Sequence, residues 1–169
     1  STISASATER FSTSVAEKKS AWVDSPMSGG DVGARNAALT LMVGAADADF
    51  RRALPILQTV GKNITHMGGV GAGQKTKLAN QIAVIGTLIS MGEALNFARE
   101  SGMDVEKVLA VISSGAAGSW SLSNYGPRVL KDDWKPGFAA ALMSKDMRLV
   151  VEALEGMTAD HSLVRRAAE

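Results

Sequence analysis

The sequence contains no cysteine among its 169 residues. This absence excludes disulfide bonds, thiolate nucleophiles and cysteine-based metal sites, and it favours a reducing, cytoplasmic setting. The two histidines, His66 and His161, lie far apart in the chain, and neither has a partner at the spacing of metal ligands. Since zinc sites are built from closely spaced His, Cys and acidic residues, no metal site is predicted.

An excess of charge of either sign is also missing, because 18 basic residues face 17 acidic ones and the net charge is +1. This balance gives no electrostatic reason to expect a nucleic acid or an anionic membrane as a partner. No segment has the basic-then-apolar form of a signal peptide. The longest apolar region, residues 78–91, is interrupted by polar side chains and is shorter than a membrane span. We therefore predict no membrane-spanning segment.

The sequence divides into two parts that differ in predicted secondary structure: the first contains strands and the second does not. Apolar residues make up 46% of the sequence, enough for a packed core. Short strands are expected at 22–24, 40–44 and 63–67, and only helices after residue 67. The longest helix is expected at 74–100, and its stretch 78–95 is apolar nearly all round, which is typical of a helix buried on every side. The predicted fold is mainly α, built on this one long buried helix and preceded by a small α/β part of about three strands.

A glycine-rich loop at 68–73 lies between the last expected strand and the long helix. This context suits a dinucleotide-binding Gly-x-Gly-x-x-Gly turn, but Gln74 and Thr76 stand where the third glycine is required. The loop is better interpreted as a turn that brings the helix N-terminus close to another group, since free N–H groups at such an end attract anions.

Three polar side chains, Lys77, Asn80 and Gln81, share one face of the long helix through spacings of three and four. A lysine on a buried helix must keep its ammonium in a cleft or lower its pKa, and a lowered pKa makes it usable as a general acid or base. A lysine near the start of a helix more often points to water. Ser28-Gly29-Gly30 likewise suits a compact anion site or an ordinary tight turn. The residues alone leave both pairs of interpretations open.

Three motifs follow one another in the chain: Asp-Ser-Pro-Met-Ser-Gly-Gly at 24–30, Gly-Ala-Gly-Gln followed by Lys-Leu-Ala-Asn-Gln across 71–81, and Pro136-Gly137-Phe138 with Lys145-Asp146. Together they resemble the signatures of the β-hydroxyacid dehydrogenases, such as 3-hydroxyisobutyrate dehydrogenase and tartronate semialdehyde reductase. Their order and spacing agree with the family, and the resemblance extends to about residue 154. Three ordered motifs are more specific than any single one.

The resemblance implies roles for individual residues. Lys77 corresponds to the catalytic lysine. The residues at substrate-binding positions are Ser28, Gly29, Gly30, Asn80 and Gln81. The residues at cofactor-facing positions are Ser1, Thr2, Phe138 and Lys145.

The implied reaction is hydride transfer between NAD or NADP and a short 3-hydroxy acid, which becomes its semialdehyde. The related 6-phosphogluconate dehydrogenases carry a Glu seven residues after the lysine. Here that position is Val84, so no decarboxylation is expected. Many relatives have two Asn residues where this chain has Asn80-Gln81, and the Asn-Gln version resembles the tartronate semialdehyde reductases.

The family's Gly-x-Gly-x-x-Gly turn is missing from this sequence. We therefore expect the C-terminal part of such an enzyme, with residues 1–67 as a remnant of the Rossmann-type nucleotide-binding domain and 68–169 as an all-helical catalytic and dimerisation domain with a shortened tail. Such a chain would bind NAD(P) weakly alone and act within a larger enzyme. The alternative is a non-catalytic helical dimerisation module. In both cases the apolar long helix predicts a homodimer or a higher homo-oligomer.

Overall fold

The computed structural model describes residues 2–158 and 161–168, which form two compact units. The first unit combines residues 1–81 with 137–169, and the second consists of residues 82–136. The domain boundary at residue 67, predicted from the change in secondary structure along the sequence, stays a prediction. The candidate site residues described below all belong to the first unit.

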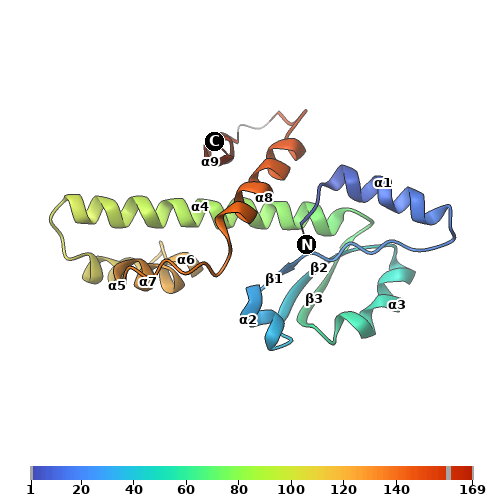
Figure 1. Ribbon diagram of the computed structural model, residues 1–169, viewed down its shortest axis with the longest axis horizontal. Helices are drawn as coiled ribbons and strands as arrows, with labels where there is room; N and C mark the ends of the chain where they lie inside the picture. Colours follow the sequence, from blue (N-terminus) through green and yellow to red (C-terminus); the bar gives the residue numbers. More distant parts are fainter. Residues whose placement is uncertain (1, 159–160, 169) are drawn as a thin grey trace. The chain divides into compact units, whose positions relative to one another are not determined.

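The first unit contains a three-stranded sheet in the order β1-β2-β3 (Figure 1). Its strands are β1 (Met27–Ser28), β2 (Leu39–Gly44) and β3 (Gly61–Gly68). β1 is antiparallel to β2, and β2 is parallel to β3. Leu39, Leu41 and Val43 are buried, and they pack with the partly buried side chains of Val23, Phe50, Leu57 and Ile64.

The strand expected at 22–24 is not formed. Only an isolated bridge joins Asp24 to Gly44, and the short strand β1 lies a few residues further along.

Among the residues that the structure describes, the helices that lie wholly in the first unit are α1 (Ala5–Ala16), α2 (Gly30–Arg35), α3 (Asp47–Leu57), α8 (Ala140–Ala153) and α9 (Ser162–Ala168). Ser4 caps α1 by accepting a hydrogen bond from the backbone N–H of Ala7 at 3.1 Å. α2 is not among the helices that the sequence predicts. Its entry requires positive φ angles of 129° at Gly29 and 62° at Gly30, which glycine adopts at low cost.

The second unit contains most of α4 (Ala72–Glu100) together with α5 (Val105–Ser114), α6 (Trp120–Asn124) and α7 (Gly126–Leu130). Met91, Leu95, Leu109 and Leu122 form its buried core. Asp104 caps α5 and Ser119 caps α6 through their side-chain oxygens. α6 and α7 are separated at Tyr125, immediately before Gly126 and Pro127, because proline removes a backbone donor inside a helix.

The expectation that the long helix is buried on every side is wrong. One side is buried, with the inward-facing residues Leu78, Gln81, Ile85, Met91, Leu95 and Ala98. At about 100° per residue, Ala79, Ala83, Ser90 and Phe97 lie together on the opposite side, where all four are exposed. We call these four residues the exposed face of α4. Most of these side chains are small or weakly polar. Counting the apolar residues of the helix therefore overestimates how much of its surface must be buried.

By length and composition α4 also meets the requirements of a membrane span, with a mean hydropathy of 1.3 over its best 18-residue window. The apolar region at 78–91 alone does not indicate this, because it is shorter than the 18-residue window. The property is weak support for a membrane location, since the core helix of a soluble protein has it too.

Candidate functional site

The start of α4 is held by a carboxylate from a distant part of the chain. Asp24 is 4% exposed, and its two oxygens accept hydrogen bonds from the backbone N–H groups of Gly71 at 2.7 Å and Gln74 at 2.9 Å. The glycine-rich loop therefore brings the N-terminus of α4 to the Asp24 carboxylate, an anion that belongs to the protein itself. The anion-binding capacity of these two N–H groups is already used.

Lys77 follows three residues after Gln74 and is half-buried. Burial lowers the pKa of its ammonium from the ordinary value of 10.5; the Asp146 carboxylate acts in the opposite direction, and the neighbouring Lys145 lowers it further. A lysine with this kind of shift holds its proton less firmly than a surface lysine, which is what proton transfer near neutral pH requires.

A buried carboxylate, Asp146 on α8, organises the polar groups around Lys77. Its side chain is 2% exposed, and Oδ2 accepts a hydrogen bond from Gln81 Nε2 at 2.7 Å. Gln81 Oε1 in turn accepts one from Asn80 Nδ2 at 2.9 Å. The other oxygen, Oδ1, lies 2.8 Å from Lys145 Nζ, but this ion pair lacks hydrogen-bond geometry and Oδ1 accepts no hydrogen bond from the described residues.

Two backbone contacts connect the N-terminal segment to this cluster. Lys145 Nζ donates a hydrogen bond to the carbonyl of Thr2 at 2.6 Å, and the N–H of Ile3 donates to Gln74 Oε1 at 3.2 Å. The structure thus brings two predicted cofactor-facing residues, Thr2 and Lys145, together beside Lys77. The third, Ser1, lies outside the described residues.

The remaining predicted residues are less closely tied to the cluster. Ser28 is half-buried at the end of β1, and Gly29 and Gly30 are exposed. Phe138 precedes α8, and its side chain is 43% exposed. Within the described part of the chain, no hydrogen bond or ion pair joins any of these residues to Lys77. Their assigned roles stay predictions.

Sequence reasoning gave no role to two of the most informative residues. Asp24 opens the first motif and Asp146 ends the third, so their place in the motifs was the available signal. Both carboxylates are buried, and a buried carboxylate is rarely kept without partners. What the sequence could not give is the identity of those partners, which lie 47 to 65 positions away along the chain.

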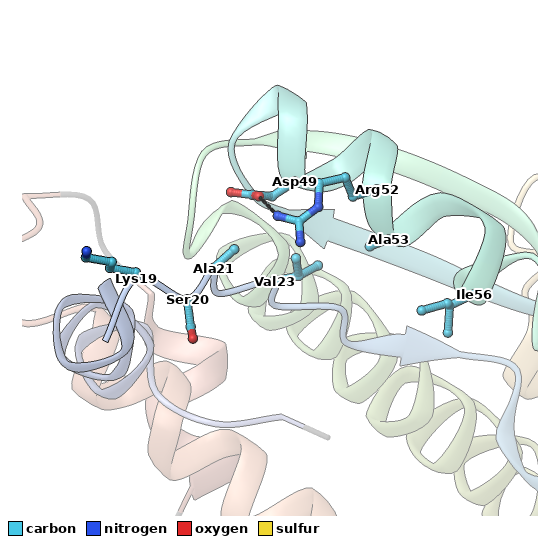
Figure 2. A pocket seen from close by; sticks show the side chains of 8 residues that line it. All are labelled: Lys19, Ser20, Ala21, Val23, Asp49, Arg52, Ala53 and Ile56. Carbon is cyan, nitrogen blue, oxygen red and sulfur yellow. Dashed lines mark hydrogen bonds and ion pairs between the residues drawn. The ribbon is translucent and has the colours of Figure 1, made fainter. Parts of the chain in front are cut away.

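A cavity of about 420 Å³ lies elsewhere in the first unit, between residues 19–23 and α3 (Figure 2). Arg52 is paired with Asp49 at 3.1 Å in its lining, while Val23 and Ile56 contribute apolar surface. None of the predicted site residues lines this cavity. The chemistry expected from the motifs is therefore assigned to the Lys77 cluster.

Two family models together match almost the whole chain. Residues 71–169 match the model described as NAD-binding of NADP-dependent 3-hydroxyisobutyrate dehydrogenase, and residues 1–69 match the NAD binding domain of 6-phosphogluconate dehydrogenase. The prediction that the chain is only the C-terminal part of such an enzyme, with no more than a remnant of the nucleotide-binding domain before it, is therefore wrong. That prediction relied on a single motif, the Gly-x-Gly-x-x-Gly turn. Residues 1–69 match a nucleotide-binding domain although they do not contain this motif.

Individual proteins show the same similarity. An uncharacterized oxidoreductase of Bacillus subtilis is 45% identical over 80% of this chain and 47% of its own length. The 2-hydroxy-3-oxopropionate reductase of Escherichia coli is 40% identical over 93% of this chain and 54% of its own. The chain thus spans about half the length of these relatives. A Mycobacterium tuberculosis 3-hydroxyisobutyrate dehydrogenase solved with L-serine superposes with a TM-score of 0.89 at 31% identity, covering 99% of this chain and 60% of that one.

Proposed function

This chain belongs to the β-hydroxyacid dehydrogenase family, and on that premise we propose that the protein containing it interconverts a short 3-hydroxy acid and its semialdehyde, with Lys77 as the general acid and base. The observation that carries the proposal is the half-buried Lys77, whose pKa is lowered by burial beside the buried Asp146 carboxylate. A lysine with a lowered pKa beside a buried, hydrogen-bonded carboxylate is typical of a proton-transfer site.

In the oxidative direction, the neutral amine of Lys77 takes the proton of the substrate hydroxyl as the carbon–oxygen double bond forms. In the reductive direction, the ammonium returns that proton to the carbonyl oxygen. Asp146 does not exchange protons with substrate in this scheme. It fixes Gln81 through the 2.7 Å hydrogen bond and opposes the effect of burial on Lys77. Both shifts together set the proton affinity of Lys77.

The groups on the predicted cofactor-facing residues suit a nicotinamide ring, which is planar and carries an amide. Phe138 offers an aromatic surface that is 43% exposed, and Thr2 and Lys145 offer a carbonyl and an ammonium that already contact each other. NAD(P) supplies or accepts the hydride when it is bound. Thr2, Phe138 and Lys145 are the residues that we expect to hold it.

We propose tartronate semialdehyde or a closely similar short carboxylate as the substrate class. Support comes from the Asn80-Gln81 pair and from the Escherichia coli relative, whose name gives 2-hydroxy-3-oxopropionate as its substrate. L-serine, present with the Mycobacterium tuberculosis relative, is itself a carboxylate with a 3-hydroxyl group. Ser28, Gly29 and Gly30 are the expected carboxylate-binding residues, and Val84 at the position of the decarboxylases' Glu favours simple oxidation.

The lowered pKa of Lys77 predicts opposite pH dependences for the two directions. Oxidation requires the neutral amine, so its kcat/KM should rise as pH increases through the pKa of Lys77. Reduction requires the ammonium, so its kcat/KM should fall over the same interval. Because burial lowers that pKa, both midpoints should lie below 10.5. Initial-rate profiles in both directions test this, and two profiles with the same slope would contradict the assigned role.

We further propose that two copies associate through the exposed face of α4. That face carries Ala79 and Ala83, whose small side chains allow close helix approach, and Phe97, which is 69% exposed. Ala83→Arg should shift the protein toward monomer in sedimentation equilibrium. Ala110→Arg, at an exposed position of α5, provides the control. Monomeric behaviour of the unmodified protein at tens of micromolar would exclude this interface.

A further inference from the structure

We propose that Asp24 is a positioning residue, which holds the first turn of α4 and thereby places Lys77 against the substrate. The inference rests on the proposed function, because it concerns the geometry of the same proton transfer. Asp24 has no assigned contact with substrate or cofactor. Its action is through the backbone that carries Lys77.

The backbone of Asp24 is fixed to the sheet. Its N–H donates to the carbonyl of Gly44 at 3.0 Å, and its carbonyl accepts from the N–H of Gly44 at 2.8 Å. These two hydrogen bonds hold Asp24 beside the end of β2. The segment 25–30, which contains Ser28, follows directly. A side chain anchored in this way is a rigid support, since little conformational freedom remains to its backbone.

The side chain of Asp24 supplies the cap that α4 lacks. The residue before α4 is Gly71, which has a φ of 87° and no side chain that could accept a hydrogen bond. Asp24 Oδ2 instead accepts from the N–H of Gln74, the third residue of the helix, which is the donor that an ordinary N-cap side chain satisfies. Asp24 Oδ1 accepts from the N–H of Gly71. The negative charge of Asp24 also interacts favourably with the positive end of the helix dipole.

The same first turn connects three predicted parts of the active site. Asp24 links it to the segment that ends at Ser28, and the side chain of Gln74 links it to Ile3, next to Thr2. Lys77 lies less than one helical turn beyond Gln74. A displacement of this turn therefore moves Lys77 relative to both the expected carboxylate site and the expected cofactor site.

Asp24→Asn tests this arrangement with almost no change in shape. The amide keeps one acceptor oxygen, but its NH₂ group faces a backbone N–H, so one of the two hydrogen bonds is lost. A misplacement of about 1 Å can cost about 10²-fold in rate. We expect kcat of the intact gene product to fall about 10–100-fold per folded molecule, while KM for NAD(P) changes less than about twofold because the cofactor contacts are kept.

Leu57→Ala is the matched control, because Leu57 packs in the core of the same unit and has no contact with α4 among the residues described for that core. Both variants are assayed well below their unfolding temperatures, with hydrogen–deuterium exchange measured in parallel. Asp24→Asn should accelerate exchange at residues 71–78 and leave 91–98 unchanged. Leu57→Ala should leave both segments and kcat close to those of the unmodified enzyme.

The outcomes separate this inference from the proposed function. If Lys77→Ala removes activity but Asp24→Asn behaves like Leu57→Ala, the positioning role is overturned while the proposed function stands. If Lys77→Ala has no effect, the proposed function itself fails. Asp24→Ser, which is smaller and keeps one acceptor, serves if Asp24→Asn does not fold. Failure of both to fold at low temperature would assign Asp24 to stability alone and would also overturn the proposal.

Discussion

Replacing Lys77 by Ala is expected to lower kcat of the intact enzyme by about 10²–10⁴-fold, the usual contribution of a positioned acid or base. The half-buried ammonium, with its lowered pKa, is the group proposed to exchange a proton with the substrate oxygen. Its removal also leaves Asp146 with only the ammonium of Lys145 nearby, so part of the loss reflects a changed electrostatic environment. The measurement is the single-turnover rate of hydride transfer at saturating substrate and cofactor.

Two further variants separate proton transfer from simple charge. Lys77→Arg keeps a cation but cannot release a proton near neutral pH, so we expect a loss similar to that of Lys77→Ala. Lys75→Ala removes a surface lysine that is 63% exposed and pairs with Glu9 at 3.4 Å, and it should change kcat less than about twofold. Retention of activity in Lys77→Arg would show that Lys77 binds the substrate electrostatically and does not transfer the proton.

Gly73→Ala is expected to destabilise the protein by about 3 kcal/mol or more, the upper end of what overpacking costs. A Cβ atom at this position would lie 2.7 Å from Asp24 Oδ2 and even closer to the carbonyl oxygen of Met42. The carbonyl belongs to the backbone of β2 and cannot rotate away. The substitution therefore forces the start of α4 away from the sheet, and chemical denaturation should show the loss in the free energy of unfolding.

Gly92→Ala is the control within the same helix. A Cβ at Gly92 would have no other heavy atom within 4 Å, and alanine has the higher helix propensity, so this variant should be stabilised by about 0.5–1 kcal/mol. The two substitutions in one helix thus have opposite predicted signs. Destabilisation by Gly92→Ala, or tolerance of Gly73→Ala, would contradict the packing described around Asp24.

The sequence predicted those elements whose determinants are local. The long helix expected at 74–100 is formed as α4, and the strands expected at 40–44 and 63–67 lie within β2 and β3. The predictions that failed depend on distant partners. The segment at 22–24 has strand-like residues but forms only one bridge with Gly44, and the side of α4 that is buried depends on which segments cover it.

The candidate site was predictable only in part, for the same reason. Lys77 could be selected because it belongs to an ordered motif, and its neighbours Asn80 and Gln81 follow from helical spacing. Asp24 and Asp146 could not be given their roles, since their contacts with Gly71 and Gln81 cross large sequence separations. Residues 1–67 were expected to be only a remnant of the nucleotide-binding domain because the Gly-x-Gly-x-x-Gly turn was taken as its defining feature, whereas residues 1–69 match the model of that domain.

Direct titration of Lys77 tests the central claim of proton transfer most closely. Lysines labelled with ¹³C at Cε can be followed by NMR in the intact enzyme, and Lys77 is assigned as the signal absent from Lys77→Arg. We expect a pKa below 10.5 that coincides with the midpoint of kcat/KM for oxidation, because that profile reports ionisation of the free enzyme. A Lys77 that titrates at 10.5 or above, or a profile whose midpoint is unchanged in Lys77→Arg, would contradict it.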